Sequence, residues 1–147
     1  RRGQHQRGDR GAAVHQRRFD FIAANFANAD MIGHTGDGAA ATAAVRTIDR
    51  EVQRILQALL AAGGQAIITA DHGNIETMLN PATGEIDSEH SATKVPFFIC
   101  RPPRRRAEGA ARKLQLRHGG ALANVAPTIL TMMGIVPPSA MTAKSLF

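Results

Sequence analysis

Apolar side chains recur at spacings of three and four residues between positions 38 and 62. Because an α-helix has about 3.6 residues per turn, this spacing gathers them along one face and predicts an amphipathic helix over residues 38–62. The apolar face consists of Val45, Ile48, Val52, Ile55, Leu56, Leu59 and Leu60. Two glycines, Gly63 and Gly64, follow directly, and a glycine in a left-handed conformation commonly ends a helix.

Three short apolar runs predict buried strands. They cover residues 19–25, 65–70 and 95–100, the first before the long helix and the other two after it. Strand, helix and strand in this order are typical of an α/β domain with a mostly parallel sheet and a right-handed crossover. A second helix is expected over residues 121–133, with Pro127 opening or kinking its main part and Gly134 after its end.

The composition is that of one globular domain. The chain has 147 residues, of which 44% are hydrophobic and 20% are charged, and a domain typically takes about 100–200 residues. No run of about 18 apolar residues occurs, so no membrane-spanning helix is expected. The single cysteine, Cys100, cannot form an internal disulfide, and the start of the sequence lacks the apolar stretch of a secretory signal. We therefore expect a cytoplasmic location and no membrane partner.

The net charge of +6 is unevenly distributed along the chain. Residues 1–18 carry a charge of +5 and residues 101–117 carry +6, so the rest of the chain carries −5. The positive charge therefore belongs to the N-terminal stretch and to one expected surface loop. The sequence also has no tyrosine or tryptophan that could stack on bases. We expect no nucleic-acid partner.

Two polar stretches that follow expected strands carry residues able to bind metals. Asp30 and His34 follow the first apolar run, and Asp71 and His72 follow the second. Because the carboxyl ends of parallel strands meet at one edge of a sheet, these four side chains are expected to converge. Singly, each could be a turn, capping or satisfied polar residue. Together they indicate a metal site, since a cation offsets the cost of placing like charges and unpaired ring nitrogens side by side.

A fifth candidate ligand, His90, ends the long loop before the third expected strand. It joins the cluster if that strand runs antiparallel to the other two, because its start then lies at the same edge of the sheet. Mixed imidazole and carboxylate ligands suit Mn²⁺, Zn²⁺, Fe²⁺ or Co²⁺ better than Ca²⁺. Five ligands exceed the needs of one four-coordinate zinc and indicate two metals, which typically hold the oxygens of a transferring phosphoryl group.

Three motifs and the C-terminal region bear a specific resemblance to one enzyme family. The motifs are Asn-Phe-Ala-Asn-Ala-Asp-Met-Ile-Gly-His-Thr-Gly at 25–36, Thr-Ala-Asp-His-Gly-Asn at 69–74, and His-Ser at 90–91 followed by Val-Pro-Phe at 95–97. With the segments 120–130 and 141–146, they resemble the cofactor-independent (2,3-bisphosphoglycerate-independent) phosphoglycerate mutases over residues 19–147. The Ala-Asp-His-Gly element alone is similar to the wider alkaline phosphatase superfamily, and the Asp-Met-Ile-Gly-His-Thr-Gly stretch narrows the resemblance to this mutase.

The resemblance implies an alkaline-phosphatase-like three-layer α/β domain, with a mostly parallel sheet flanked by helices, of which this chain is the incomplete C-terminal part. It further implies a glycolytic isomerase that interconverts 3-phosphoglycerate and 2-phosphoglycerate through a phosphoserine intermediate at a centre of two Mn²⁺ ions. By matching positions, Asp30, His34 and His90 would bind one metal, and Asp71 and His72 the other. The implied partner is the phosphoglycerate substrate, and the complete enzyme is expected to be a monomer.

The sequence also departs from the family pattern. No serine occupies the family's nucleophile motif, so we assign no catalytic residue within the chain itself. Residues 1–18 match nothing in the family and are expected to be a disordered tail or an artefact of the gene model, whereas residues 19–147 form the C-terminal part of the phosphatase-like domain. Two alternatives stay open: a catalytically inactive metal-binding remnant, and another enzyme of the superfamily such as a phosphopentomutase.

Overall fold

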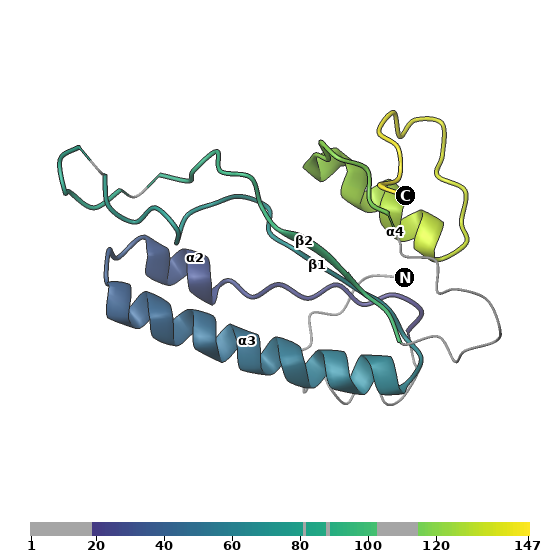
Figure 1. The fold of residues 1–147 in the computed structure, drawn as a ribbon, viewed down its shortest axis with the longest axis horizontal. Coiled ribbons are helices and arrows are strands. Elements are labelled where there is room, and N and C mark those ends of the chain that lie inside the picture. The colour runs from purple at the N-terminus through teal and green to yellow at the C-terminus, as the bar shows by residue number, and fades with distance from the viewer. Residues whose placement is uncertain (1–18, 81, 88, 103–114) are drawn as a thin grey trace. The chain divides into compact units, whose positions relative to one another are not determined.

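The structure, a computed structural model, describes residues 19–80, 82–87, 89–102 and 115–147. The tail predicted over residues 1–18 lies outside this described part. The chain divides into two compact units, Arg1–Pro102 and Pro103–Phe147. The elements, labelled in part in Figure 1, are α2 (Asn28–Gly33), α3 (Gly38–Ala61), β1 (Ala66–Thr69) and β2 (Phe97–Cys100) in the first unit, and η1 (Leu122–Asn124) and α4 (Val125–Met132) in the second.

The long helix α3 forms where the apolar periodicity predicted it. Asp37 caps its start, because the carboxylate Oδ1 accepts hydrogen bonds from the backbone N–H groups of Ala39 and Ala40, each at 2.9 Å. Gly63 follows its end with a φ of 80°, a left-handed conformation that glycine adopts without steric cost. No helix in the described ranges combines the length and apolarity needed to cross a membrane.

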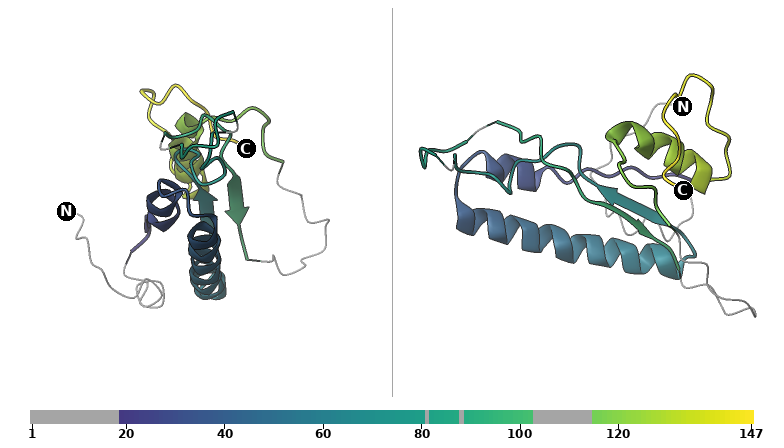
Figure 2. Two further views of the ribbon diagram at one scale, coloured as in Figure 1. Left: turned by 90° about the vertical axis from the view of Figure 1, so that its left-hand side faces the viewer. Right: turned by 45° about the horizontal axis from the view of Figure 1, so that its top comes forward.

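The short helix α2 packs beside α3, as the views in Figures 1 and 2 show. The hydrophobic pattern did not predict it, because six residues are too few to display a helical period. A helix this short has little stability of its own in water. Its packing against α3 therefore stabilises it, and this contact between segments is not visible in the local sequence.

The prediction of a strand over residues 19–25 is wrong. These residues form no strand and are exposed. A strand requires a neighbour that pairs with its backbone N–H and C=O groups. The sheet of the described chain contains only β1 and β2, and this run is not one of its strands.

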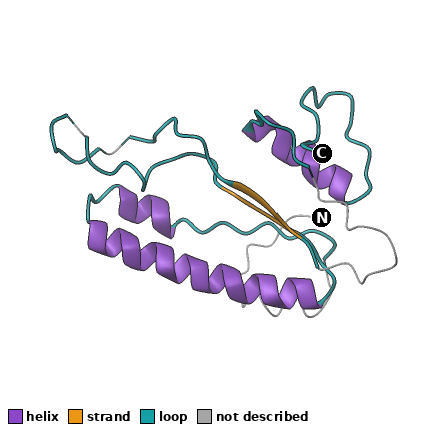
Figure 3. Cartoon of the chain, viewed as in Figure 1, coloured by secondary structure: helices purple, strands orange, loops and turns teal. Residues whose placement is uncertain are grey.

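The two strands pair antiparallel, with Ala66 opposite Cys100. Beyond them the antiparallel course continues in isolated bridges between Gly73 and Ser91 and between Leu79 and Ile86. The segment between β1 and β2 is otherwise loop in its described residues, as Figure 3 shows. Parallel strands, which the predicted fold class names, are not among the described strands. The antiparallel pairing meets the condition under which His90 was expected to join the metal-binding cluster.

Many large apolar side chains of the first unit are exposed to solvent. Phe21 is 53% exposed and Phe98 is 57% exposed. Even Val45, in the predicted apolar face of α3, is 46% exposed. Large exposed apolar areas are typical of surfaces that pack against further protein.

The second unit is organised around Thr128. The helix predicted over residues 121–133 is present as η1 and α4, and Gly134 follows it with a φ of 73°. The Thr128 side chain is fully buried, and its hydroxyl donates a hydrogen bond to the carbonyl oxygen of Asn124 at 2.6 Å. The same hydroxyl accepts a hydrogen bond from the backbone N–H of Leu146 at 3.0 Å. One side chain thus ties the C-terminal segment to α4.

We predict that Thr128→Val lowers the free energy of unfolding by about 1–3 kcal/mol, because it leaves the N–H of Leu146 without its acceptor. Urea denaturation gives the loss, and faster hydrogen exchange at the Leu146 amide locates it. Thr131→Val is the matched control, since the Thr131 hydroxyl only donates to the Pro127 carbonyl within the same helix. Equal exchange rates at Leu146 in wild type and Thr128→Val would contradict the role of this hydroxyl.

Candidate metal centre

The helix α2 brings Asp30 and His34 together. Residues four apart lie on the same face of a helix, one turn from each other. The Nε2 atom of His34 is 3.3 Å from Oδ1 of Asp30. Thr35 fixes the turn after the helix, because its hydroxyl donates to the carbonyl oxygen of Ile32 at 2.7 Å and accepts from the N–H of Asp37 at 3.2 Å. Local hydrogen bonds therefore hold this half of the site.

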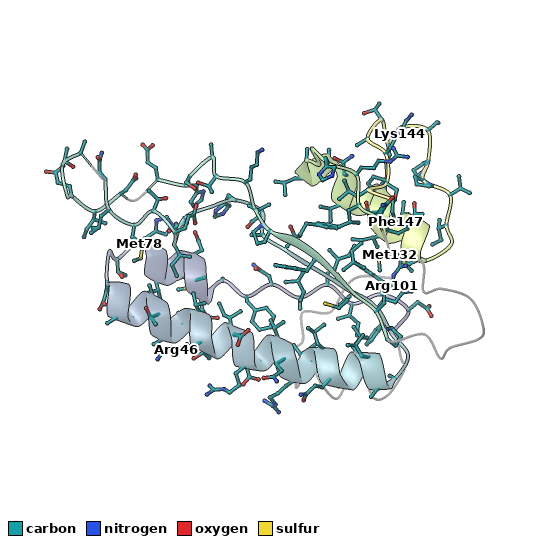
Figure 4. All side chains as sticks on the ribbon, viewed as in Figure 1. Arg46, Met78, Arg101, Met132, Lys144 and Phe147 are labelled. Atoms are coloured by element: carbon teal, nitrogen blue, oxygen red, sulfur yellow. The ribbon has the colours of Figure 1, made fainter. Side chains whose placement is uncertain are left out.

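The third residue, His90, comes from the loop that leads into β2. Its Nε2 atom is 3.4 Å from the same oxygen, Oδ1 of Asp30, that His34 approaches. The adjacent residue, Ser91, donates its backbone N–H to the carbonyl oxygen of Gly73 at 2.8 Å. This bridge holds the His90 segment against the segment that follows β1. Figure 4 draws the side chains that lie between this loop region and α2.

The three side chains fit a divalent metal. One potential ligand atom from each of Asp30, His34 and His90 lies within 4.8 Å of the other two. Two ligand atoms that each bind a metal at about 2.1 Å in tetrahedral geometry lie about 3.4 Å apart. The carboxylate oxygen lies 3.3 and 3.4 Å from the two ring nitrogens, which matches this spacing. One carboxylate and two imidazoles suit Mn²⁺, Zn²⁺, Fe²⁺ or Co²⁺.

His72 and Asp71 lie differently from these three. The imidazole of His72 stacks on that of His90, with ring centroids 3.7 Å apart and planes 12° from parallel. Its Nε2 atom is 3.7 Å from Oδ2 of Asp71, whose side chain is 89% exposed. The structure therefore gathers Asp30, His34 and His90 and places His72 against the group. Asp71 is next to His72 but does not reach the other three.

Asn74 is a residue of this site that the sequence reasoning did not single out. It is 5% exposed, and its amide Nδ2 donates a hydrogen bond to Oδ1 of Asp30 at 3.0 Å. Nδ2 also lies 3.1 Å from Nε2 of His34. The other amide atom, Oδ1, is buried without a hydrogen-bond partner among the described residues and lies against Gly33, where a Cβ would overlap it. Its place directly after Asp71, His72 and Gly73 was the available sequence signal.

Glu76 is a second residue near this site that the sequence reasoning did not single out. Its Oε1 accepts a hydrogen bond from the Ser91 hydroxyl, and its Oε2 accepts one from the backbone N–H of Asn74 at 2.9 Å. The hydrogen bond from Ser91 is the main cause that lowers the pKa of Glu76 from its ordinary value of 4.5. Glu76 is therefore a carboxylate at neutral pH. It does not belong to the three-residue group but lies one hydrogen bond from the residue that follows His90.

Comparisons with known proteins agree with a metal centre. Residues 9–137 match the pattern of the metalloenzyme superfamily. The chain is 46% identical over 134 residues to the 2,3-bisphosphoglycerate-independent phosphoglycerate mutase of Pseudomonas aeruginosa, an alignment that covers 91% of this chain and 24% of that protein. The protein of the same name from Thermomicrobium roseum is also 46% identical over 134 residues, with 91% and 25% covered. The chain thus spans about a quarter of the length of these curated relatives.

A solved structure supports the fold. The crystal structure of Leishmania mexicana phosphoglycerate mutase, determined at low cobalt concentration, superimposes with a TM-score of 0.75 and 26% sequence identity. The match covers 93% of this chain and 26% of that one. It confirms the α/β class and, together with the superfamily match, the alkaline-phosphatase-like architecture of which this chain is a part.

We predict that Gly33→Ala destabilises the metal-free chain by about 1–3 kcal/mol, because the added methyl group overlaps Oδ1 of Asn74 and displaces its side chain. Thermal denaturation measures the loss, and a shift of the Asn74 side-chain amide resonances in NMR spectra locates it. Gly38→Ala is the matched control, since an added Cβ at Gly38 meets nothing within 4 Å. Equal stability of the two variants would show that Asn74 is not held against Gly33.

Proposed function

Because the chain belongs to the metalloenzyme superfamily, we propose that it supplies the metal-binding part of a 2,3-bisphosphoglycerate-independent phosphoglycerate mutase. The observation that carries this proposal is the approach of two imidazoles, from His34 and His90, to one carboxylate oxygen of Asp30. The similarity to mutases over 91% of the chain supports the choice of reaction. The activity is proposed for a complete active centre, since the chain spans only about a quarter of those relatives.

In this proposal Asp30, His34 and His90 bind one divalent metal, and His72 and Asp71 contribute to a second. Mn²⁺ is our choice for both, as the family resemblance implies. Bound metals of this kind stabilise negative charge on phosphoryl oxygens and lower the pKa of a hydroxyl nucleophile. The chain's own side chains hold and orient these ions, and the neutral form of each imidazole is the form that binds a metal.

The proposed reaction is the interconversion of 3-phosphoglycerate and 2-phosphoglycerate in glycolysis. Its phosphoserine intermediate requires a serine nucleophile, which we do not assign to any serine of this chain. We propose that the complete enzyme acts in the cytoplasm as a monomer on this substrate. The open apolar surface of the first unit, which includes Phe21 and Phe98, supports the view that further protein packs against it.

A metal-binding protein without turnover is the second candidate. The observation that favours it is the position of Asp71, whose side chain is 89% exposed and contacts His72 only at 3.7 Å. The residues proposed for the second metal are thus less well gathered than those proposed for the first. Phosphoryl transfer between two metals needs both sites, whereas binding of one metal needs only the first.

We predict that the purified chain binds Mn²⁺, and that His34→Ala and His90→Ala each weaken binding by about a hundredfold or more, because each removes one of three ligands. Isothermal titration calorimetry measures the dissociation constants. His118→Ala is the matched control, since His118 is exposed and lies in the second unit. Wild-type affinity in both ligand variants would place the metal elsewhere and remove the main support for the proposed function.

The reaction is tested in a chimera in which residues 19–147 replace the matching quarter of the Pseudomonas aeruginosa mutase. We expect the chimera to convert 3-phosphoglycerate to 2-phosphoglycerate, and the same chimera with His34→Ala to lose activity by about a hundredfold or more. A coupled enolase assay measures the rate, and circular dichroism checks the fold. A folded chimera that binds Mn²⁺ but has no activity would instead favour the metal-binding protein without turnover.

A further inference from the structure

Glu76 makes contacts that neither the three-residue group nor the proposed reaction explains. Its two carboxylate oxygens accept from two different donors, the hydroxyl of Ser91 and the backbone N–H of Asn74. Hydrogen bonds to an ionised acceptor are about twice as strong as those between neutral groups. The residue is on the protein surface, yet both of its oxygens are engaged with the loop.

The contacts of Glu76 close a compact ring of backbone and side chains. Gly73, which is buried, pairs with Ser91 through the backbone hydrogen bond of 2.8 Å. The Glu76 carboxylate and the Ser91 hydroxyl both lie so close to the Gly73 backbone that a Cβ there would overlap each of them. The ring therefore requires glycine at this position and holds the two loop segments at close range.

Two residues of this ring, Ser91 and Asn74, connect it directly to the metal centre. Ser91 follows His90, whose Nε2 lies 3.4 Å from Asp30. Asn74 donates its side-chain amide to the same Asp30 oxygen at 3.0 Å. By accepting from Ser91 and from the backbone of Asn74, Glu76 links the segment that supplies His90 to the residue that holds Asp30.

We propose that Glu76 is a positioning residue that fixes His90 beside His72 and Asp30. The proposal rests on the metal centre proposed above for its link to metal affinity. The described residues of the segment between the strands have no regular secondary structure to fix their side chains, so each ligand that the loop supplies must be oriented by specific hydrogen bonds. Residues that orient metal ligands typically contribute about 10–100-fold to metal affinity.

The chemistry of Glu76 predicts how its substitutions differ. Alanine removes both acceptors, so the N–H of Asn74 and the hydroxyl proton of Ser91 each lose the acceptor that Glu76 provides, while the Ser91 oxygen still accepts from the N–H of Thr93. Glutamine keeps one oxygen for the N–H of Asn74, and its amide can donate to the Ser91 hydroxyl, which then accepts. Glu76→Gln should therefore retain most of the positioning although it carries no charge. A residue that binds the metal through its charge would lose its role in both variants.

The first test measures Co²⁺ binding and the visible absorption of the bound ion for the full chain and its variants. We expect Glu76→Ala and Ser91→Ala to weaken binding by about 10–100-fold and to change the absorption band, with Glu76→Gln close to wild type. The double variant should lose no more than Glu76→Ala alone, because the Ser91 hydroxyl acts through its contact with Glu76. Glu85→Ala is the control, since Glu85 is an exposed carboxylate of the same loop.

A second readout needs no metal. The stacking of His72 on His90 should displace their ring-proton resonances in NMR spectra of the metal-free, histidine-labelled chain. We expect Glu76→Ala to abolish this displacement and Glu76→Gln and Glu85→Ala to preserve it. If the wild type binds no Co²⁺ but Glu76→Ala still abolishes the displacement, the metal centre is wrong and the positioning of His90 stands.

Two results would overturn the proposal. One is Glu76→Ala with wild-type Co²⁺ affinity and wild-type ring-proton resonances. The other is a loss of Co²⁺ binding in both Glu76→Ala and Glu76→Gln as complete as in His34→Ala, with Ser91→Ala unaffected. That pattern would make Glu76 a metal ligand.

Discussion

The antiparallel course of the chain between β1 and β2 is the constraint on which the candidate site depends. Beyond the paired strands, the bridge between Gly73 and Ser91 keeps two loop segments in contact although neither forms a regular strand there. This bridge sets His90 opposite the segment that carries His72 and Asn74. Without it, His90 would be joined to the other residues of the candidate site only through a long loop, and closing and ordering such a loop costs conformational entropy.

Asp30 lies at the centre of this arrangement. One of its carboxylate oxygens faces the Nε2 atoms of His34 and His90 and the Nδ2 atom of Asn74, all within 3.4 Å. Three nitrogens from three segments of the chain therefore surround one carboxylate oxygen. The hydrogen bonds of Glu76 connect two of these segments through Ser91 and Asn74.

The two units differ in how they are stabilised. The first unit leaves large apolar side chains such as Phe21 and Phe98 open, and its site is held mainly by polar contacts. The second unit ties its C-terminal segment to α4 through the buried hydroxyl of Thr128. In relatives about four times as long, the similar region is a part of a larger protein. A fold that is one part of a larger domain need not bury its apolar surface within itself.

Sequence alone was sufficient for the features that depend on local order and composition. The period of α3, the glycine after its end, the positions of β1 and β2 and the types of residue in the candidate metal centre follow from neighbours along the chain. Tertiary structure decided the rest. The run 19–25, expected as a strand, is not a strand of the described sheet, and β1 and β2 pair antiparallel. The helix α2 forms because it packs on α3, and Asn74 and Glu76 acquire their roles only through contacts with Asp30 and Ser91. Such contacts join residues distant in the sequence, so no periodicity or propensity reports them.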